Sequence, residues 1–97
     1  MNKNIPKERK IEMYQAILQL KDIEECCDFF EDICAEAELR SMEQRFEVAR
    51  MLKQDKVYVE ISQATNASSA TISRVKRMLN SGTGCIGRIV DRMEEKE

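Results

Sequence analysis

Apolar side chains recur at intervals of three and four residues along most of this 97-residue chain. This spacing places them on one face of a helix, whereas the alternation expected of strands is weak. The sequence has one Pro and three Gly, so few positions would interrupt a helix. We therefore predict an all-α fold of about six helices. The expected helical segments are residues 6–20, 22–34, 36–54, 57–65, 68–80 and a last one from residue 85.

Local signals support several of these boundaries. Pro6 suits the first position of a helix because it lacks the N–H group that would be unpaired there. Asp22 followed by Glu25 resembles a capping box at the start of the second helix. The break near Ala35 is less sharply marked. Val57 and its two neighbours are individually β-prone, which leaves a short strand as an alternative there. We expect the acidic tail, residues 94–97, to fray.

The length indicates one domain, residues 1–97. A chain this short buries a small share of its surface, and sharing a core with a second copy would relieve that. Aromatic residues make up 5% of the sequence and Trp is absent. Burial must therefore come from aliphatic residues, Met, Ala and Cys, which is consistent with helices that pack within a dimer.

The charge is unevenly distributed around a net value of −2. Residues 21–38 contain eight acids and one base, Lys21. Residues 57–82 contain Arg74, Lys76 and Arg77 against Glu60 alone. Because phosphate neutralisation supplies much of the affinity for nucleic acid, the second segment is the one suited to meet DNA.

The four cysteines, Cys26, Cys27, Cys34 and Cys85, have no C-x-x-C spacing and no His to join them. We therefore expect neither a metal site nor a disulfide framework. Cys27, Phe30 and Cys34 would share one helix face as small core residues. The charged start is unlike a signal peptide, and no apolar run approaches the roughly 20 residues of a membrane span. These features predict a cytoplasmic protein with no membrane partner.

Residues 57–80 have the pattern of a helix-turn-helix. Ile61 and Thr65 can face a second helix at positions i and i+4. Asn66 tolerates the left-handed backbone that ends a helix. Ser68 is a suitable N-cap for the helix that follows, with Ile72 and others turned inward. A short support helix, a tight turn and a second helix would result.

The second helix would present small and basic groups outward. Ser69, Ala70 and Ser73 are small enough to let the helix approach base edges, while Arg74 and Arg77 would grip phosphates. The structural alternative is an ordinary surface helix with a solvated basic face. The candidate DNA-binding residues are Tyr58, Ser62, Ser68, Ser69, Ala70, Ser73, Arg74, Lys76 and Arg77.

The run ATISRVKRMLN at 70–80 resembles the recognition helix of the Trp repressor-like family, particularly its YerC/YecD branch. The similarity extends back through YVEI at 58–61 and QRFEVA at 44–49, and spans about residues 33–84. It implies an intertwined homodimer that places two recognition helices in successive major grooves of a near-palindromic operator. It also implies a transcriptional regulator, acting as a repressor on double-stranded DNA.

The resemblance also bears on an effector. Two arginines that bracket L-tryptophan in the Trp repressor have counterparts in Arg45 and Arg74, if one residue is gapped. Ala35 and Glu36 replace a threonine and a proline of that pocket, and Met78 replaces a serine. Glu36 adds a negative charge where a carboxylate would lie, and Met78 removes a hydroxyl. These differences argue against tryptophan as corepressor, and no cofactor is expected.

Two other classes of function compete with this interpretation. The acidic second helix could bind a basic partner in a helical dimer whose helix-turn-helix is vestigial. An enzyme is disfavoured because the chain has no His, no cysteine beside a base and no Gly-rich phosphate loop.

Overall fold

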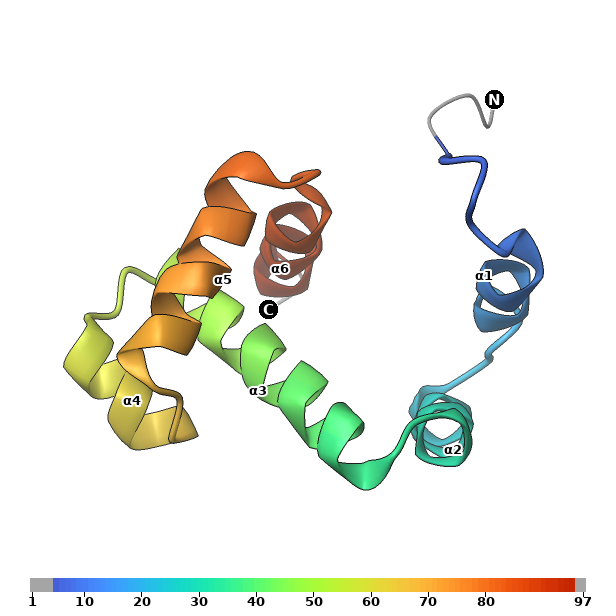
Figure 1. Ribbon diagram of the computed structural model, residues 1–97, viewed down its shortest axis with the longest axis horizontal. Helices are drawn as coiled ribbons and strands as arrows, with labels where there is room; N and C mark the ends of the chain where they lie inside the picture. Colours follow the sequence, from blue (N-terminus) through green and yellow to red (C-terminus); the bar gives the residue numbers. More distant parts are fainter. Residues whose placement is uncertain (1–4, 96–97) are drawn as a thin grey trace. The chain divides into compact units, whose positions relative to one another are not determined.

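The computed structural model describes residues 5–95 and contains six α-helices and no strand within that range (Figure 1). The prediction of an all-α fold of about six helices is confirmed, and the alternative of a strand near Val57 is wrong. The chain divides after Ala35 into two compact units. The helices are α1 (Ile11–Ile17), α2 (Ile23–Ile33), α3 (Glu36–Lys53), α4 (Tyr58–Thr65), α5 (Ser69–Ser81) and α6 (Cys85–Glu95).

The first unit contains α1 and α2, and α1 is shorter than predicted. Pro6 lies in a turn, where its carbonyl accepts a hydrogen bond from the Arg9 N–H at 3.1 Å, and the helix begins only at Ile11. The expected start at Pro6 is therefore wrong. Residues 7–10 are all charged, and a short segment without apolar contacts gains too little to offset the entropy of helix formation.

The start of α2 agrees with the prediction. Asp22 Oδ1 accepts a hydrogen bond from the Glu25 N–H at 2.8 Å. Glu25 Oε1 in turn accepts from the N–H of Lys21, at 3.0 Å, rather than from that of Asp22. The Asp cap is thus confirmed, while the reciprocal half of the box is shifted by one residue.

No residue of α1 or α2 is buried, which corrects the expected core face of α2. Cys27 is exposed, and Phe30 and Cys34 are only partly covered. Large apolar side chains are also exposed here, with Leu18 at 81% and Ile23 at 80%. The helical spacing was identified correctly, but two short helices supply too little surface to enclose their own apolar faces.

The second unit encloses the core. Its long helix α3 packs against α4, α5 and α6, and α4 packs against α5 (Figure 1). Burial is concentrated in the C-terminal half of α3, since Met42 remains 40% exposed while Val48 and Ala49 are fully buried. The core cluster consists of Val48, Ala49, Ile61, Ala67, Ile72 and Val75.

Helix α6 is held against the end of α3 by polar contacts as well as by buried Val90. Lys53 Nζ lies 3.2 Å from Asp91 Oδ1, and Gln54 Nε2 donates to Glu94 Oε2 at 3.2 Å. Helix α6 continues to Glu95, so the expected fraying is wrong for residues 94 and 95. Residues 96 and 97 lie outside the described range. Within residues 5–95, no helix is long and apolar enough to cross a membrane.

Candidate nucleic-acid interface

The turn between α4 and α5 is built from local hydrogen bonds. Asn66 has φ 63° and ψ 13°, in the left-handed region, and its N–H donates to the Ser62 carbonyl at 2.8 Å. The Thr65 hydroxyl donates to the Ile61 carbonyl at 2.8 Å and accepts from the Ala67 N–H at 3.1 Å. The predicted role of Asn66 is confirmed, and the turn needs no glycine because Asn tolerates this conformation.

Ser68 begins α5 as an N-cap, as predicted. Its Oγ accepts a hydrogen bond from the Thr71 N–H at 3.1 Å and donates to Thr71 Oγ1 at 3.2 Å. These two bonds occupy the hydroxyl with the helix itself. Ser68 therefore positions α5 in this structure, rather than offering a free group to a ligand.

Core packing fixes the angle between the two helices. Ile61 of α4 and Ile72 of α5 are 0% exposed, and Val75 is 1% exposed. Gln44 Nε2 on α3 donates to the Thr65 carbonyl at 3.0 Å, which satisfies one of the open carbonyls at the end of α4. The support helix, the turn and the second helix therefore form one packed unit on α3.

The outward face of α5 carries the predicted small and basic residues. Ala70, Ser73 and Arg77 follow one another at three and four residues and lie opposite the buried stripe. Ala70 and Arg77 are exposed, and so is Ser69 at the start of the helix, while Ser73 is half-buried. The arrangement leaves a narrow exposed ridge with a basic end.

Two predicted residues lie on α4, and the structure relates them to α5 differently. Tyr58 Oη is 3.4 Å from Ser73 Oγ, so the start of α4 touches the middle of α5. Ser62 is half-buried and contributes its carbonyl to the turn through Asn66. Tyr58 therefore joins the candidate interface, whereas Ser62 takes part in the turn.

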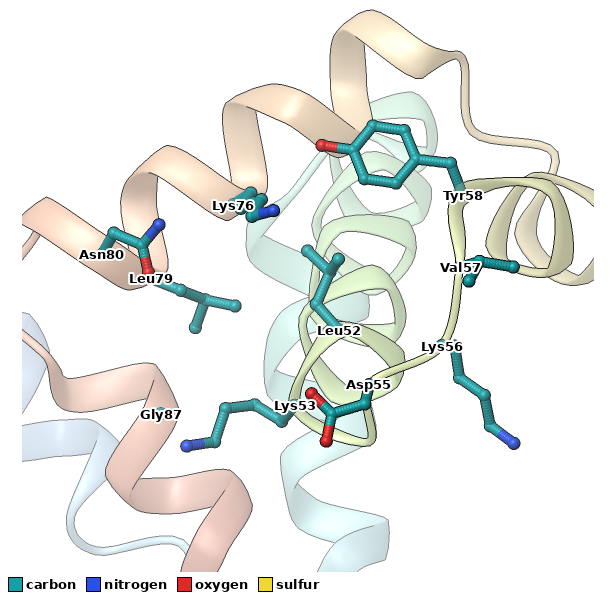
Figure 2. Close-up of a pocket in the computed structure, with 10 residues that line it drawn as sticks. All are labelled: Leu52, Lys53, Asp55, Lys56, Val57, Tyr58, Lys76, Leu79, Asn80 and Gly87. Atoms are coloured by element: carbon teal, nitrogen blue, oxygen red, sulfur yellow. The ribbon is translucent and has the colours of Figure 1, made fainter.

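An open cleft of about 500 Å³ lies beside α5 (Figure 2). The sequence did not predict it, because its lining residues are far apart in the chain and meet only when the helices pack. Its lining comes from the end of α3, the start of α4, α5 and α6. The lining residues are Leu52, Lys53, Asp55, Lys56, Val57, Tyr58, Lys76, Leu79, Asn80 and Gly87.

The candidate effector residues lie elsewhere in the second unit. Arg45 is half-buried on α3, and its Nη1 donates to Ser41 Oγ at 2.8 Å. Arg74 is exposed on α5, and neither arginine lines the cleft. Glu36 pairs with Arg40 Nε at 2.8 Å, so its carboxylate is already engaged within α3. Within residues 5–95, no three potential metal ligands cluster together.

Comparison with known proteins agrees with this geometry. Residues 10–94 match the family described as Trp repressor protein. The chain belongs to this family. It is 49% identical over 86 residues to the uncharacterised Bacillus subtilis protein YerC, covering 89% of this chain and 83% of YerC. The family is regulatory and non-enzymatic, and the resemblance identified at residues 70–80 is confirmed.

Two crystal structures have the same fold. A TrpR-like protein from Eubacterium eligens is 49% identical, with a TM-score of 0.83 over 87% of each chain. A Staphylococcus aureus protein provisionally described as a Trp repressor is 42% identical, with a TM-score of 0.86 over 97% of this chain and 94% of that one. The helix-turn-helix of this chain is thus set in a Trp repressor-like fold.

Proposed function

We propose that this protein is a sequence-specific, double-stranded-DNA-binding transcriptional regulator that acts as a repressor. The observation that carries the proposal is the outward face of α5, where exposed Ala70 and Arg77 flank half-buried Ser73 on a capped, packed helix. A helix in the major groove needs small side chains at its N-terminal end to approach base edges closely. Ser69 and Ala70 meet that need.

Each side chain has a role that follows from its chemistry. Ser69 and Ser73 can donate to or accept from base edges, and Ala70 can contact a thymine methyl group. Arg77 is long enough to reach a guanine or a phosphate, and Arg74 lies on the flank where phosphate is the nearer target. Tyr58, 3.4 Å from Ser73, supports that serine from α4.

The local charge supports DNA over a protein partner at this face. Residues 57–82 have three bases and one acid, a balance of +2 in a chain of net charge −2. The acidic residues are concentrated in residues 21–38, away in sequence from the helix-turn-helix. We therefore expect DNA to meet the basic side of the helix-turn-helix and not residues 21–38, because acidic segments are repelled by phosphate.

A homodimer belongs to the same proposal. The first unit exposes Leu18 at 81%, Ile23 at 80% and Ile33 at 55%, which is more large apolar surface than a small monomer normally leaves in water. A second copy would cover these side chains and join both units into one domain, residues 1–97. The two-fold symmetry of the dimer would match that of a near-palindromic operator. We place this function in the cytoplasm.

Selection of bound duplexes from a genomic library tests the proposal directly. The full-length protein is expected to enrich a small set of near-palindromic fragments at low salt. No enrichment of any fragment, with the protein folded by circular dichroism, would refute it.

The substitution Arg77→Ala then tests whether the outward face of α5 contacts DNA. If Arg77 reads a base, affinity for the selected fragment falls by about 1–3 kcal/mol and preference at one base pair relaxes. Arg92→Ala, which removes an exposed arginine from α6, is the matched control. Equal losses in both variants would show that charge alone, and not the α5 face, determines binding.

A further inference from the structure

The cleft beside α5 is unaccounted for by the contacts assigned so far. We propose that it receives the phosphate backbone of DNA, with Lys76 inside the cleft and Lys56 at its rim each neutralising one phosphate. The proposal rests on the DNA-binding function above. It adds that the Lys76 side of α5 contacts the backbone of one of the two DNA strands.

The position of the cleft on α5 is the first argument. Lys76 follows Arg74 by two residues, which is a rotation of about 200° around the helix axis. The two bases therefore flank the outward ridge on opposite sides. The major groove is about 12 Å wide and a helix with its side chains is about 10–12 Å across, so each flank faces one of the two strands.

The charges in the cleft are the second argument. Lys53, Lys56 and Lys76 line it against the single acid Asp55. Lys53 also pairs with Asp91, outside the lining, at 3.2 Å. Counting Asp55 and Asp91 against the three lysines leaves a surplus of one positive charge. Within the described part of the chain, Lys56 and Lys76 form no ion pair. They are the bases available to an incoming anion.

The positions of the two lysines on the lining are the third argument. In Figure 2, Lys76 lies on α5 near Tyr58 and Leu52, while Lys56 projects from the turn before α4 and away from Lys76, so each lysine can meet a different phosphate. Asn80 adds an amide that can donate to phosphate oxygen. The nearby carboxylate of Glu60 accepts a hydrogen bond from the Val57 N–H at 3.2 Å.

The cleft is also distinct from the place of the candidate effector residues. Neither Arg45 nor Arg74 lines it, and Arg74 lies on the other flank of α5. A phosphate bound in the cleft would fix the register of the helix on the duplex without specifying a base.

The test compares the salt dependence of DNA binding by two double variants with equal charge. In K56Q/K76Q, log K should fall less steeply with log salt, by about 1.8 per bound protomer, since each phosphate contact contributes about 0.9. Between about 50 and 200 mM salt, the loss of affinity per protomer should then be about tenfold smaller. Affinity should fall alike for the selected duplex and a scrambled one, because phosphate contacts carry no sequence information.

R88Q/R92Q is the control, because it also removes two positive charges from exposed positions of the same unit. Its slope should stay close to that of the wild type, and K56R/K76R should retain the wild-type slope. An unchanged slope in K56Q/K76Q, or an equal change in both glutamine variants, would overturn the proposal. Failure of the wild type itself to bind any duplex would instead refute the proposed function, and the phosphate site with it.

A titration with pyrophosphate tests whether the cleft binds a small phosphate compound instead of the DNA backbone. Pyrophosphate is titrated against the free wild-type protein and followed by thermal shift. We expect no saturable shift at concentrations that leave DNA binding intact. A saturable shift at such concentrations, lost in K56Q/K76Q, would assign the cleft to a small molecule and overturn the DNA assignment.

Discussion

Replacing Ile61 by alanine tests whether the helix-turn-helix depends on its packing against α3. Ile61 is 0% exposed and belongs to the core cluster that joins α3, α4 and α5. The change removes three carbon atoms, worth about 0.8 kcal/mol each in transfer free energy, or about 2.4 kcal/mol together. The cavity left among Val48, Ile72 and their neighbours adds to this, so we expect a total loss of about 3–4 kcal/mol. That is a large share of the stability of a small domain.

Urea unfolding followed by circular dichroism measures the loss, at one fixed protein concentration because a dimer's stability depends on concentration. Val59→Ala is the matched control. Val59 lies on the same helix but is 66% exposed, so its loss should stay within about 0.5 kcal/mol. If the two variants lost equal stability, or if Ile61→Ala lost less than about 1 kcal/mol, α4 would not be anchored through this side chain.

Two further substitutions examine the turn and the cap by the same unfolding assay. Asn66→Ala should cost about 1 kcal/mol because alanine is strained at φ 63°, whereas Asn66→Gly should be close to neutral; equal effects would contradict the left-handed conformation. Ser68→Ala should cost about 1 kcal/mol by removing the bond to the Thr71 N–H, and Ser69→Ala, one residue further along, should cost less. A Ser68 variant as stable as the Ser69 variant would remove the capping role.

Features that depend on neighbouring residues were predictable from the sequence. The caps at Asp22 and Ser68 each join a side chain to a backbone N–H three residues away, and the left-handed backbone of Asn66 is a property of that residue itself. Apolar spacing identified Ile61 and Ile72 as inward-facing for the same reason. These signals also located the helix-turn-helix, because that motif is itself a local arrangement of two helices and a turn.

Features that depend on tertiary neighbours were not predictable in this way. The predicted start of the first helix was wrong because Pro6 permits a helix start but does not cause one. The prediction that Cys27 lies on a buried face was wrong, because residue spacing identifies an apolar face without showing what covers it. The cleft was missed because Lys53 and Gly87 are 34 residues apart in sequence and meet only when α6 packs on α3.

The charge distribution has a consequence for specificity. A chain of net charge −2 places few bases against DNA, so its affinity for random duplex should be low at physiological salt. The discrimination between operator and other DNA must then come from the close fit of Ser69, Ala70 and Ser73 to the base edges. In that case, enlarging Ala70 should reduce binding to the operator far more than binding to random DNA.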